Sequence, residues 1–324
     1  MARRRGTKGK AKRYPVQRFL YFDLSHTGDS EDNHYIDLAA CLSAINGRLY
    51  RQGRMYHVAN ATIHDTDGNA KQVKLSTIAD TYTARTGWHM MFDAWKDQRA
   101  RTLENSSGEI TGKWADFKVL LNADMKGDAD WCKPLNSDRQ AIRITKNGGT
   151  DSEWMYSTVE YTDSDGTPFS AQSLGMYGVT NQASGYVSIT NEYTNAVAQT
   201  QVETPTLGNL ANSVILGMNP LNSGAIPQEI LDNIADDNDV PPYSAAFPIG
   251  FKNPNGGSLP QNEAPFPVRE MGITSTSVTT QTVGGFPVPL GLLQVETQAT
   301  AANTIGLLLE LVPGTYKGVH SEAY

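Results

Sequence analysis

The sequence is poor in cysteine, poor in charged residues and without long apolar runs. Only two of its 324 residues are cysteines, which excludes a disulfide scaffold and a cysteine-ligated zinc site. We interpret both, Cys41 and Cys132, as reduced packing residues. No apolar stretch approaches the length of a membrane-spanning helix, so we expect no membrane contact. The basic start is not followed by an apolar run, and we therefore expect no signal peptide.

Familiar catalytic motifs are also missing. The sequence has no G-x-S-x-G elbow, no P-loop, no H-E-x-x-H and no dinucleotide-binding glycine motif. The six histidines show no metal-ligand spacing, and His57 and His64 should face opposite sides of one strand because their separation is odd. We expect no catalytic residue, no cofactor and no metal. The acidic run Asp232–Asp239 lacks the EF-hand register; a solvated loop is favoured, with Ca²⁺ at a subunit contact as the alternative.

Threonine and glycine are abundant instead, with 30 and 29 residues, a composition typical of strands and turns. Apolar alternation predicts about ten strands. The clearest are 16–24, 55–64, 71–78, 272–283, 290–298 and 303–312; 114–121, 140–145 and 154–161 are further candidates, and 186–190 and 213–216 are weaker ones. The turn-forming residues 65–69 join the second and third of these, which predicts a hairpin.

One segment has a helical period. Within Gly87–Glu104, the large side chains Trp88, Met91, Phe92 and Trp95 recur at spacings of three and four, which predicts an α-helix at about 88–104 with its aromatic stripe in the core. One helix among many strands indicates an all-β fold, an antiparallel sandwich or barrel with long insertions. The stretch 219–268, dense in Pro, Asn and Gly, is expected to be a loop excursion.

Charge is distributed very unevenly along the chain. Residues 147–324 hold three basic and 17 acidic side chains, whereas residues 1–18 hold eight basic side chains and no acidic one. These eight are Arg3, Arg4, Arg5, Lys8, Lys10, Lys12, Arg13 and Arg18. Mutual repulsion and the lack of apolar side chains predict a flexible arm, and its cations predict binding to nucleic-acid phosphates without sequence preference.

A second basic group precedes the strand at 55–64. Arg48, Arg51 and Arg54 alternate with Tyr50 and Tyr56. Arginines can hold phosphates while neighbouring aromatic rings stack on bases, so this group is a second candidate nucleic-acid contact. An ordinary exposed loop before a strand is the alternative.

These features together resemble an icosahedral capsid protein. The Met1-Ala2-Arg3-Arg4-Arg5 start, the short basic arm, the strand Phe19-Leu20-Tyr21-Phe22 and the body rich in Thr, Asn and Gly are similar to capsid (coat) proteins of small circular Rep-encoding single-stranded DNA viruses, the circovirus-like (CRESS-DNA) group. The resemblance implies a single eight-stranded jelly roll over 19–324, with long loops between strands and the helix at 88–104 inserted in one of them.

The resemblance also implies partners and a location. The chain would be a homo-oligomer of about sixty copies in an icosahedral shell, with the arm on a single-stranded genome, DNA by this resemblance. Eight arm cations per copy would supply about 480 positive charges to genome phosphates. The expected location is the virion, and the host nucleus during assembly; the sequence identifies no host receptor. The alternatives are a small RNA-virus coat protein, a non-viral nucleic-acid-binding β protein, and a jelly-roll hydrolase or lectin.

Overall fold

The computed structural model describes residues 16–28, 31–65, 71–105, 116–126, 131–142, 154–162, 166, 168–200, 265–273, 279–299 and 301–324. Seven of the eight arm cations, the acidic run Asp232–Asp239 and most of the 219–268 excursion lie outside these residues. Among the described residues, no helix is both long and apolar enough to cross a membrane.

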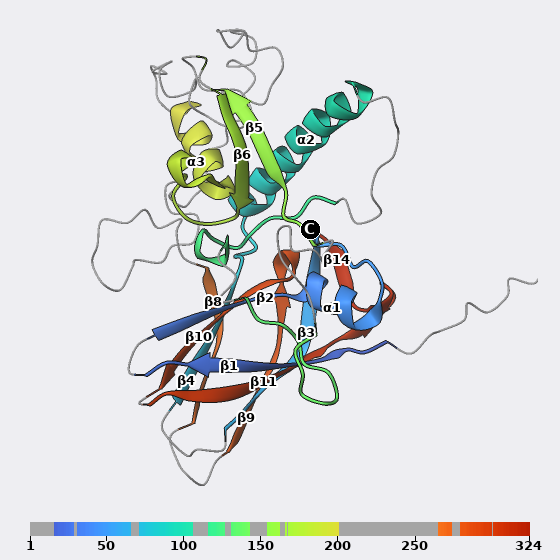
Figure 1. Cartoon of the computed structure of the whole chain (residues 1–324), viewed down its shortest axis with the longest axis vertical. Helices are drawn as coiled ribbons and strands as arrows, with labels where there is room; N and C mark the ends of the chain where they lie inside the picture. The colour runs from blue at the N-terminus through green and yellow to red at the C-terminus, as the bar shows by residue number, and fades with distance from the viewer. Residues whose placement is uncertain are drawn as a thin grey trace, which may run out of the picture.

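The main body consists of two antiparallel sheets that lie face to face (Figure 1). In the first sheet, β1 pairs with β11, β11 pairs with β3, and β3 pairs further with β9 and with the short β14. These strands are β1 (Phe19–His26), β11 (Asn303–Leu311), β3 (Arg54–His64), β9 (Thr280–Val288) and β14 (Ser321–Ala323). The second sheet has the order β2 (Glu31–Asp37), β10 (Leu292–Ala299), β4 (Lys71–Thr77) and β8 (Phe266–Ile273).

The core lies between the two sheets and follows the apolar alternation of the sequence. In β1, Leu20, Phe22 and Leu24 are fully buried, while the residues between them are exposed or half-buried. Their counterparts on other strands join the same continuous core. Alternate side chains of a strand point to opposite faces, so each strand contributes one row to the core. This confirms the mostly β, antiparallel sandwich expected from the sequence.

One predicted strand pairing and one predicted strand are wrong. β3 and β4 do not form a hairpin, because β3 lies in the first sheet and β4 in the second. The predicted single strand 272–283 is likewise parts of β8 and β9, which belong to opposite sheets. In both cases the chain passes from one sheet to the other. Alternation identifies the face that a strand buries, but it carries no information about its partner.

The described residues contain three α-helices, α1 (Leu38–Asn46), α2 (Tyr82–Asn105) and α3 (Ile189–Thr200), rather than the single helix predicted. α2 contains the predicted segment and begins earlier. α1 ends at Gly47, whose φ of 59° is the left-handed conformation that glycine favours at helix ends. The predicted strand 186–190 is only in part a strand, since β7 (Tyr186–Ser188) runs directly into α3. The described parts of the predicted strands 114–121 and 140–145 form isolated bridges only, at Leu120 and Ala141, and 213–216 lies outside the described residues.

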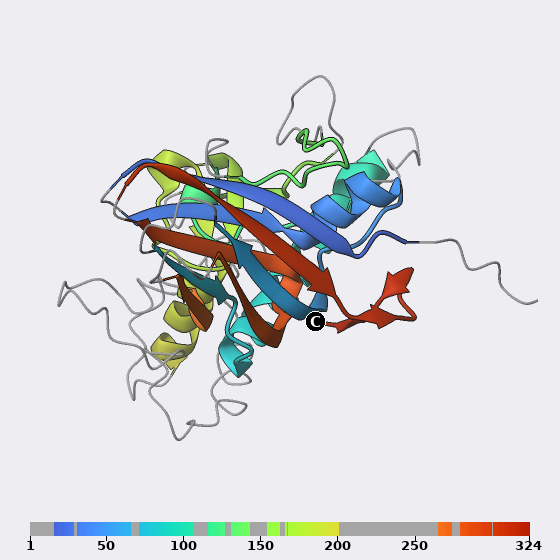
Figure 2. The ribbon, with the colours of Figure 1, turned by 90° about the horizontal axis from the view of Figure 1, so that it is seen from below.

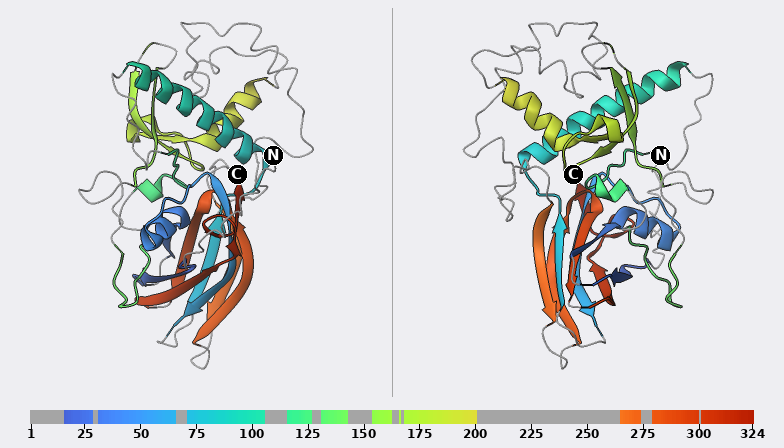
Figure 3. Two further views of the ribbon diagram at one scale, coloured as in Figure 1. Left: turned by 90° about the vertical axis from the view of Figure 1, so that its right-hand side faces the viewer. Right: turned by 60° about the vertical axis from the view of Figure 1, so that its left-hand side comes forward.

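Helices and strands from the segment between β4 and β8 form a lobe at one end of the sandwich (Figure 3). It contains α2, α3 and a small sheet of β5 (Thr158–Thr162), β6 (Pro168–Gly175) and β7. The aromatic stripe of α2 is packed inside, as predicted: the Trp88 and Phe92 rings stack at 5.3 Å, and Phe117 lies edge-on to Trp88 at 5.7 Å. Short 3-10 helices occur at η1 (Asp124–Lys126), η2 (Gln182–Ser184) and η3 (Pro289–Gly291), and β12 (Pro313–Gly314) pairs with β13 (Gly318–Val319).

The buried carboxylate of Asp37 joins the lobe to the sandwich. Its Oδ1 accepts a hydrogen bond from Ala40 N at 3.0 Å and so caps α1. Its Oδ2 accepts from Gln52 Nε2 at 3.0 Å, and from Trp154 Nε1 and Tyr156 OH at 3.1 Å each. Asp37 stands at the end of β2, whereas Trp154 and Tyr156 precede β5 in the lobe. One fully buried side chain therefore fixes a helix, a loop and the lobe in one place.

We expect Asp37→Ala to destabilise the protein by about 3–5 kcal/mol, because the substitution removes a helix cap and leaves several buried donors without an acceptor. Urea unfolding of both proteins in the same oligomeric state measures this difference. Asp93→Ala, at an exposed position on α2, is the matched control and should change little. A loss below about 1 kcal/mol for Asp37→Ala would contradict the assigned role.

The difference in unfolding free energy between wild type and Asp37→Ala should also depend on pH, and the pKa of Asp37 determines the sign of that dependence. Burial raises the pKa of Asp37 above its usual range, although its hydrogen bonds oppose that shift. The folded protein then holds this proton more tightly than the unfolded chain does, so the carboxyl favours folding most below its usual pKa. The stability gap between wild type and Asp37→Ala should therefore narrow as the pH rises through the raised pKa.

Candidate nucleic-acid interface

The described chain begins at the root of the basic arm, where Val16, Gln17 and Arg18 are anchored to the body. Gln17 N donates to Asn46 Oδ1 at 2.9 Å, and Asn46 Nδ2 donates back to Gln17 O at 3.1 Å. Leu311 N donates to Arg18 O at 3.0 Å. The arm therefore leaves the body beside the end of α1 and the β12–β13 hairpin, which lie at the same end of the molecule in Figure 2.

The β12–β13 hairpin presents Lys317 at its tip. Tyr316 and Val319 exchange backbone hydrogen bonds of 3.1 and 3.0 Å around the two-residue turn Lys317-Gly318. The φ angles of these two residues, 50° and 98°, are both positive, as in the type I′ turns that connect twisted strands most readily. A Cβ at Gly318 would lie 2.7 Å from Val16 Cγ2, so glycine is also needed for the arm root to pass this close.

Hydrogen bonds tie the second basic group to this hairpin. Arg51 N donates to Tyr316 OH at 3.0 Å, and Tyr50 OH donates to Lys317 O at 2.9 Å. Tyr56 OH donates to Arg51 O at 2.7 Å. Both Tyr50 and Tyr56 are fully buried, and burial raises the pKa of each, which keeps the two hydroxyls protonated as donors. The prediction that these two rings stack on bases is wrong, because their rings lie inside the fold.

The elements that meet at the arm root carry four cations, which we call the basic patch: Arg18 at the root itself, Arg48 and Arg51 just after α1, and Lys317 in the hairpin turn. Arg51 has 62% of its side chain exposed and pairs with Asp116 at 3.1 Å. Lys317 is exposed, and its Nζ donates to Leu49 O. The patch thus brings together predicted residues from two separate segments. Lys317 escaped sequence reasoning because it stands alone in the acidic part of the chain.

Arg54 differs from the other predicted arginines. Its Nε donates to Ser321 Oγ at 2.7 Å, and its Nη2 donates to Ser321 O at 2.9 Å. Its guanidinium lies 4.0 Å from the centroid of the Tyr316 ring, a cation–π contact. Arg54 therefore holds β14 and the β12–β13 hairpin against β3, and its hydrogen-bonding capacity is turned inward.

The remaining predicted contacts, Arg3, Arg4, Arg5, Lys8, Lys10, Lys12 and Arg13, lie outside the described residues. Comparisons of the chain with protein-family models, curated proteins and solved structures give no match.

Arg54→Ala and Arg51→Ala should have different effects on the free energy of unfolding. Arg54→Ala removes two hydrogen bonds and a cation–π contact, and we expect a loss of about 1–3 kcal/mol in denaturant unfolding. Arg51→Ala removes an exposed ion pair and should stay within about 1 kcal/mol of wild type. Equal losses for the two variants would show that Arg54 does not have the structural role assigned to it.

Proposed function

We propose that this protein is a viral capsid protein that self-assembles into an icosahedral shell and packages a single-stranded genome through its basic N-terminal arm. We infer first that its eight main strands form a jelly roll. Along the chain these strands are β1, β2, β3, β4, β8, β9, β10 and β11. The first pairs with the eighth, the second with the seventh, the third with the sixth and the fourth with the fifth. Such nested pairing in two sheets is how jelly rolls, common in capsids, are built.

The observation that carries the proposal is the position of the arm root. Gln17 is bonded to Asn46 at the end of α1, and Val16 packs against Gly318 beside Lys317. The last described residues of the arm therefore lie beside the basic patch on the body. In this proposal, nucleic acid bound by the arm also contacts Arg51 and Lys317.

Phosphate binding of this kind needs charge rather than a shaped pocket. Arginine and lysine side chains neutralise phosphates and release counterions, and this interaction does not depend on sequence. Binding without sequence preference suits a packaging protein, because its subunits contact many different stretches of one genome. The remainder of the chain carries the net negative charge, which leaves the positive charge concentrated at one end. In this proposal the chain has no catalytic role.

A small RNA-virus coat protein is the second candidate, because phosphate contacts alone do not distinguish DNA from RNA. The discriminating experiment is negative-stain electron microscopy of the purified protein, together with its ratio of absorbance at 260 and 280 nm. Uniform closed shells with nuclease-protected nucleic acid would support the proposal, and digestion of the extracted genome with DNase or RNase would identify its type. A monomer or dimer over a range of salt and pH would contradict it.

The arm should account for packaging. Replacing the seven cations between Arg3 and Arg13 by glutamine keeps the chain length and the root contacts of Val16, Gln17 and Arg18. We expect this variant to fold and to lose nuclease-protected nucleic acid. For unassembled subunits on single-stranded oligonucleotides, the slope of log K against log salt should fall by about 5, or about 0.7 per cation. Normal packaging by this variant would show that the arm cations are not needed for packaging.

The basic patch should make a smaller contribution to the salt dependence of nucleic-acid binding. We expect Arg51→Gln combined with Lys317→Asn to lower the salt slope by about 1.4, as two phosphate contacts would. Asparagine is suited to position 317 because it tolerates positive φ. Arg101→Gln, exposed on α2 in the lobe, is the control and should leave the slope at the wild-type value. An equal slope in all three proteins would show that the patch does not touch nucleic acid.

A further inference from the structure

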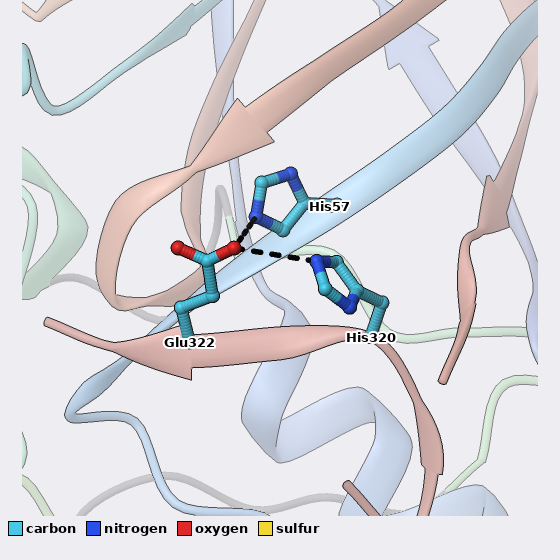
Figure 4. Close-up of side chains that lie close together, drawn as sticks. All are labelled: His57, His320 and Glu322. Atoms are coloured by element: carbon cyan, nitrogen blue, oxygen red, sulfur yellow. Dashed lines mark ion pairs between the residues drawn. The ribbon is translucent and has the colours of Figure 1, made fainter. Parts of the chain in front are cut away.

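Two histidines and a glutamate from distant parts of the sequence meet on the outer face of the first sheet (Figure 4). His57 lies on β3, Glu322 lies on β14, and His320 directly precedes β14. Two backbone hydrogen bonds fix their spacing, from Val312 N to His57 O at 2.9 Å and from His320 N to Val312 O at 2.7 Å. The pairing of β14 with β3 holds Glu322 opposite Met55, the second neighbour of His57.

A β-bulge in the pairing of β3 with β11 places the side chain of His57 on the outer face of the sheet. The register between β3 and β11 shifts between Glu310 and Leu311, so Ala59 is an extra residue on β3. Along β3 the buried residues are accordingly Tyr56, Val58, Ala61 and Ile63, while His57 and His64 are both partly exposed. The prediction that these two histidines face opposite sides is therefore wrong, since the bulge restores them to the same face.

The three side chains direct their ligating atoms toward one point. Glu322 Oε1 lies 3.4 Å from His320 Nε2 and 4.0 Å from His57 Nε2. One ligating atom from each of the three residues lies within 4.8 Å of the other two. The imidazole rings are 4.7 Å apart between centroids and tilted by 48° to one another.

His57 Nε2 is the atom that most needs a partner. It is buried and has no hydrogen-bond partner, because Glu322 Oε1 at 4.0 Å is beyond hydrogen-bond distance. Leaving a buried polar atom unsatisfied is costly.

We propose that His57, His320 and Glu322 form a binding site for a divalent metal ion of the zinc class. Two imidazoles and one carboxylate are a ligand set that suits Zn²⁺, whereas Ca²⁺ and Mg²⁺ prefer oxygen ligands throughout. Ligand atoms about 2.0–2.2 Å from a tetrahedral ion lie about 3.4 Å from one another, so side-chain shifts of about 1 Å would close the site. Three protein ligands leave the fourth position for water or an external donor.

The ion would fasten the C-terminal segment to β3. Immediately after this segment, Tyr324 is buried and its ring lies edge-on to Trp88 of the lobe at 5.6 Å. Arg54 holds Ser321 from the opposite face of the same strand pair. A metal bond to His320 and Glu322 would therefore stabilise the contact between sandwich and lobe, and this effect is independent of nucleic-acid binding.

The test is a Zn²⁺ titration of the full-length protein after removal of metals with a chelator, followed by isothermal calorimetry. We expect saturable binding of one ion at this site and a higher unfolding temperature with Zn²⁺. His57→Gln and Glu322→Gln should each weaken that binding by at least tenfold, about what the loss of even an outer-shell partner costs. His64→Gln, on the same strand and face, should bind as the wild type does.

Cobalt distinguishes this site from others on the chain. Co²⁺ bound by two imidazoles and a carboxylate in tetrahedral geometry should give visible d–d absorption, which His57→Gln should lose while His64→Gln keeps it. Circular dichroism of the metal-free variants checks that they are folded. Absence of saturable binding in the wild type, or equal affinity and equal spectra in the wild type and His57→Gln, would overturn the proposal.

Discussion

The arrangement of sandwich and lobe depends on the hydrogen bonds that the buried carboxylate of Asp37 accepts. A charge in the interior is tolerated only where donors replace its water, and here four of them do so. Lys118 adds a nearby positive charge, buried with its Nζ 4.8 Å from the centroid of the Trp154 ring. Burial lowers the pKa of Lys118, while Asp116 and Asp37 act in the opposite direction. The junction is therefore polar and directional, which fixes one orientation of the lobe.

A second set of contacts gathers at the C-terminal segment. Within a few residues, Lys317 joins the basic patch, Ser321 accepts hydrogen bonds from Arg54, and Tyr324 packs on Trp88 of the lobe. The two faces of one short strand pair thus serve different purposes. Ser321 and Arg54 face one side, and His320, Glu322 and His57 face the other. The end of the chain connects the proposed nucleic-acid surface with the junction that Asp37 holds.

The sequence predicted elements well where the signal is local. The apolar alternation of β1 and β11 and the aromatic period of α2 all correspond to structure. The sequence does not predict which strands pair, because the apolar alternation of β3 and β4 is the same whether they pair or lie in opposite sheets. α1 is not predicted, because its nine residues are too few to show a clear helical period, although Asp37 and Gly47 mark its two ends. His57 and His320 carry no spacing signal, because only the pairing of β14 with β3 brings them together.

The nested strand pairing also dictates when the protein can fold during its own synthesis. β1 and β2 are made first, yet their partners β11 and β10 are among the last strands to leave the ribosome. The lobe has the opposite character, because β5, β6 and β7 pair with one another within a short stretch of chain. Local contacts form faster than distant ones. The lobe can therefore take shape while the first two strands still wait with their apolar faces exposed, a period in which the nascent chain is vulnerable to aggregation.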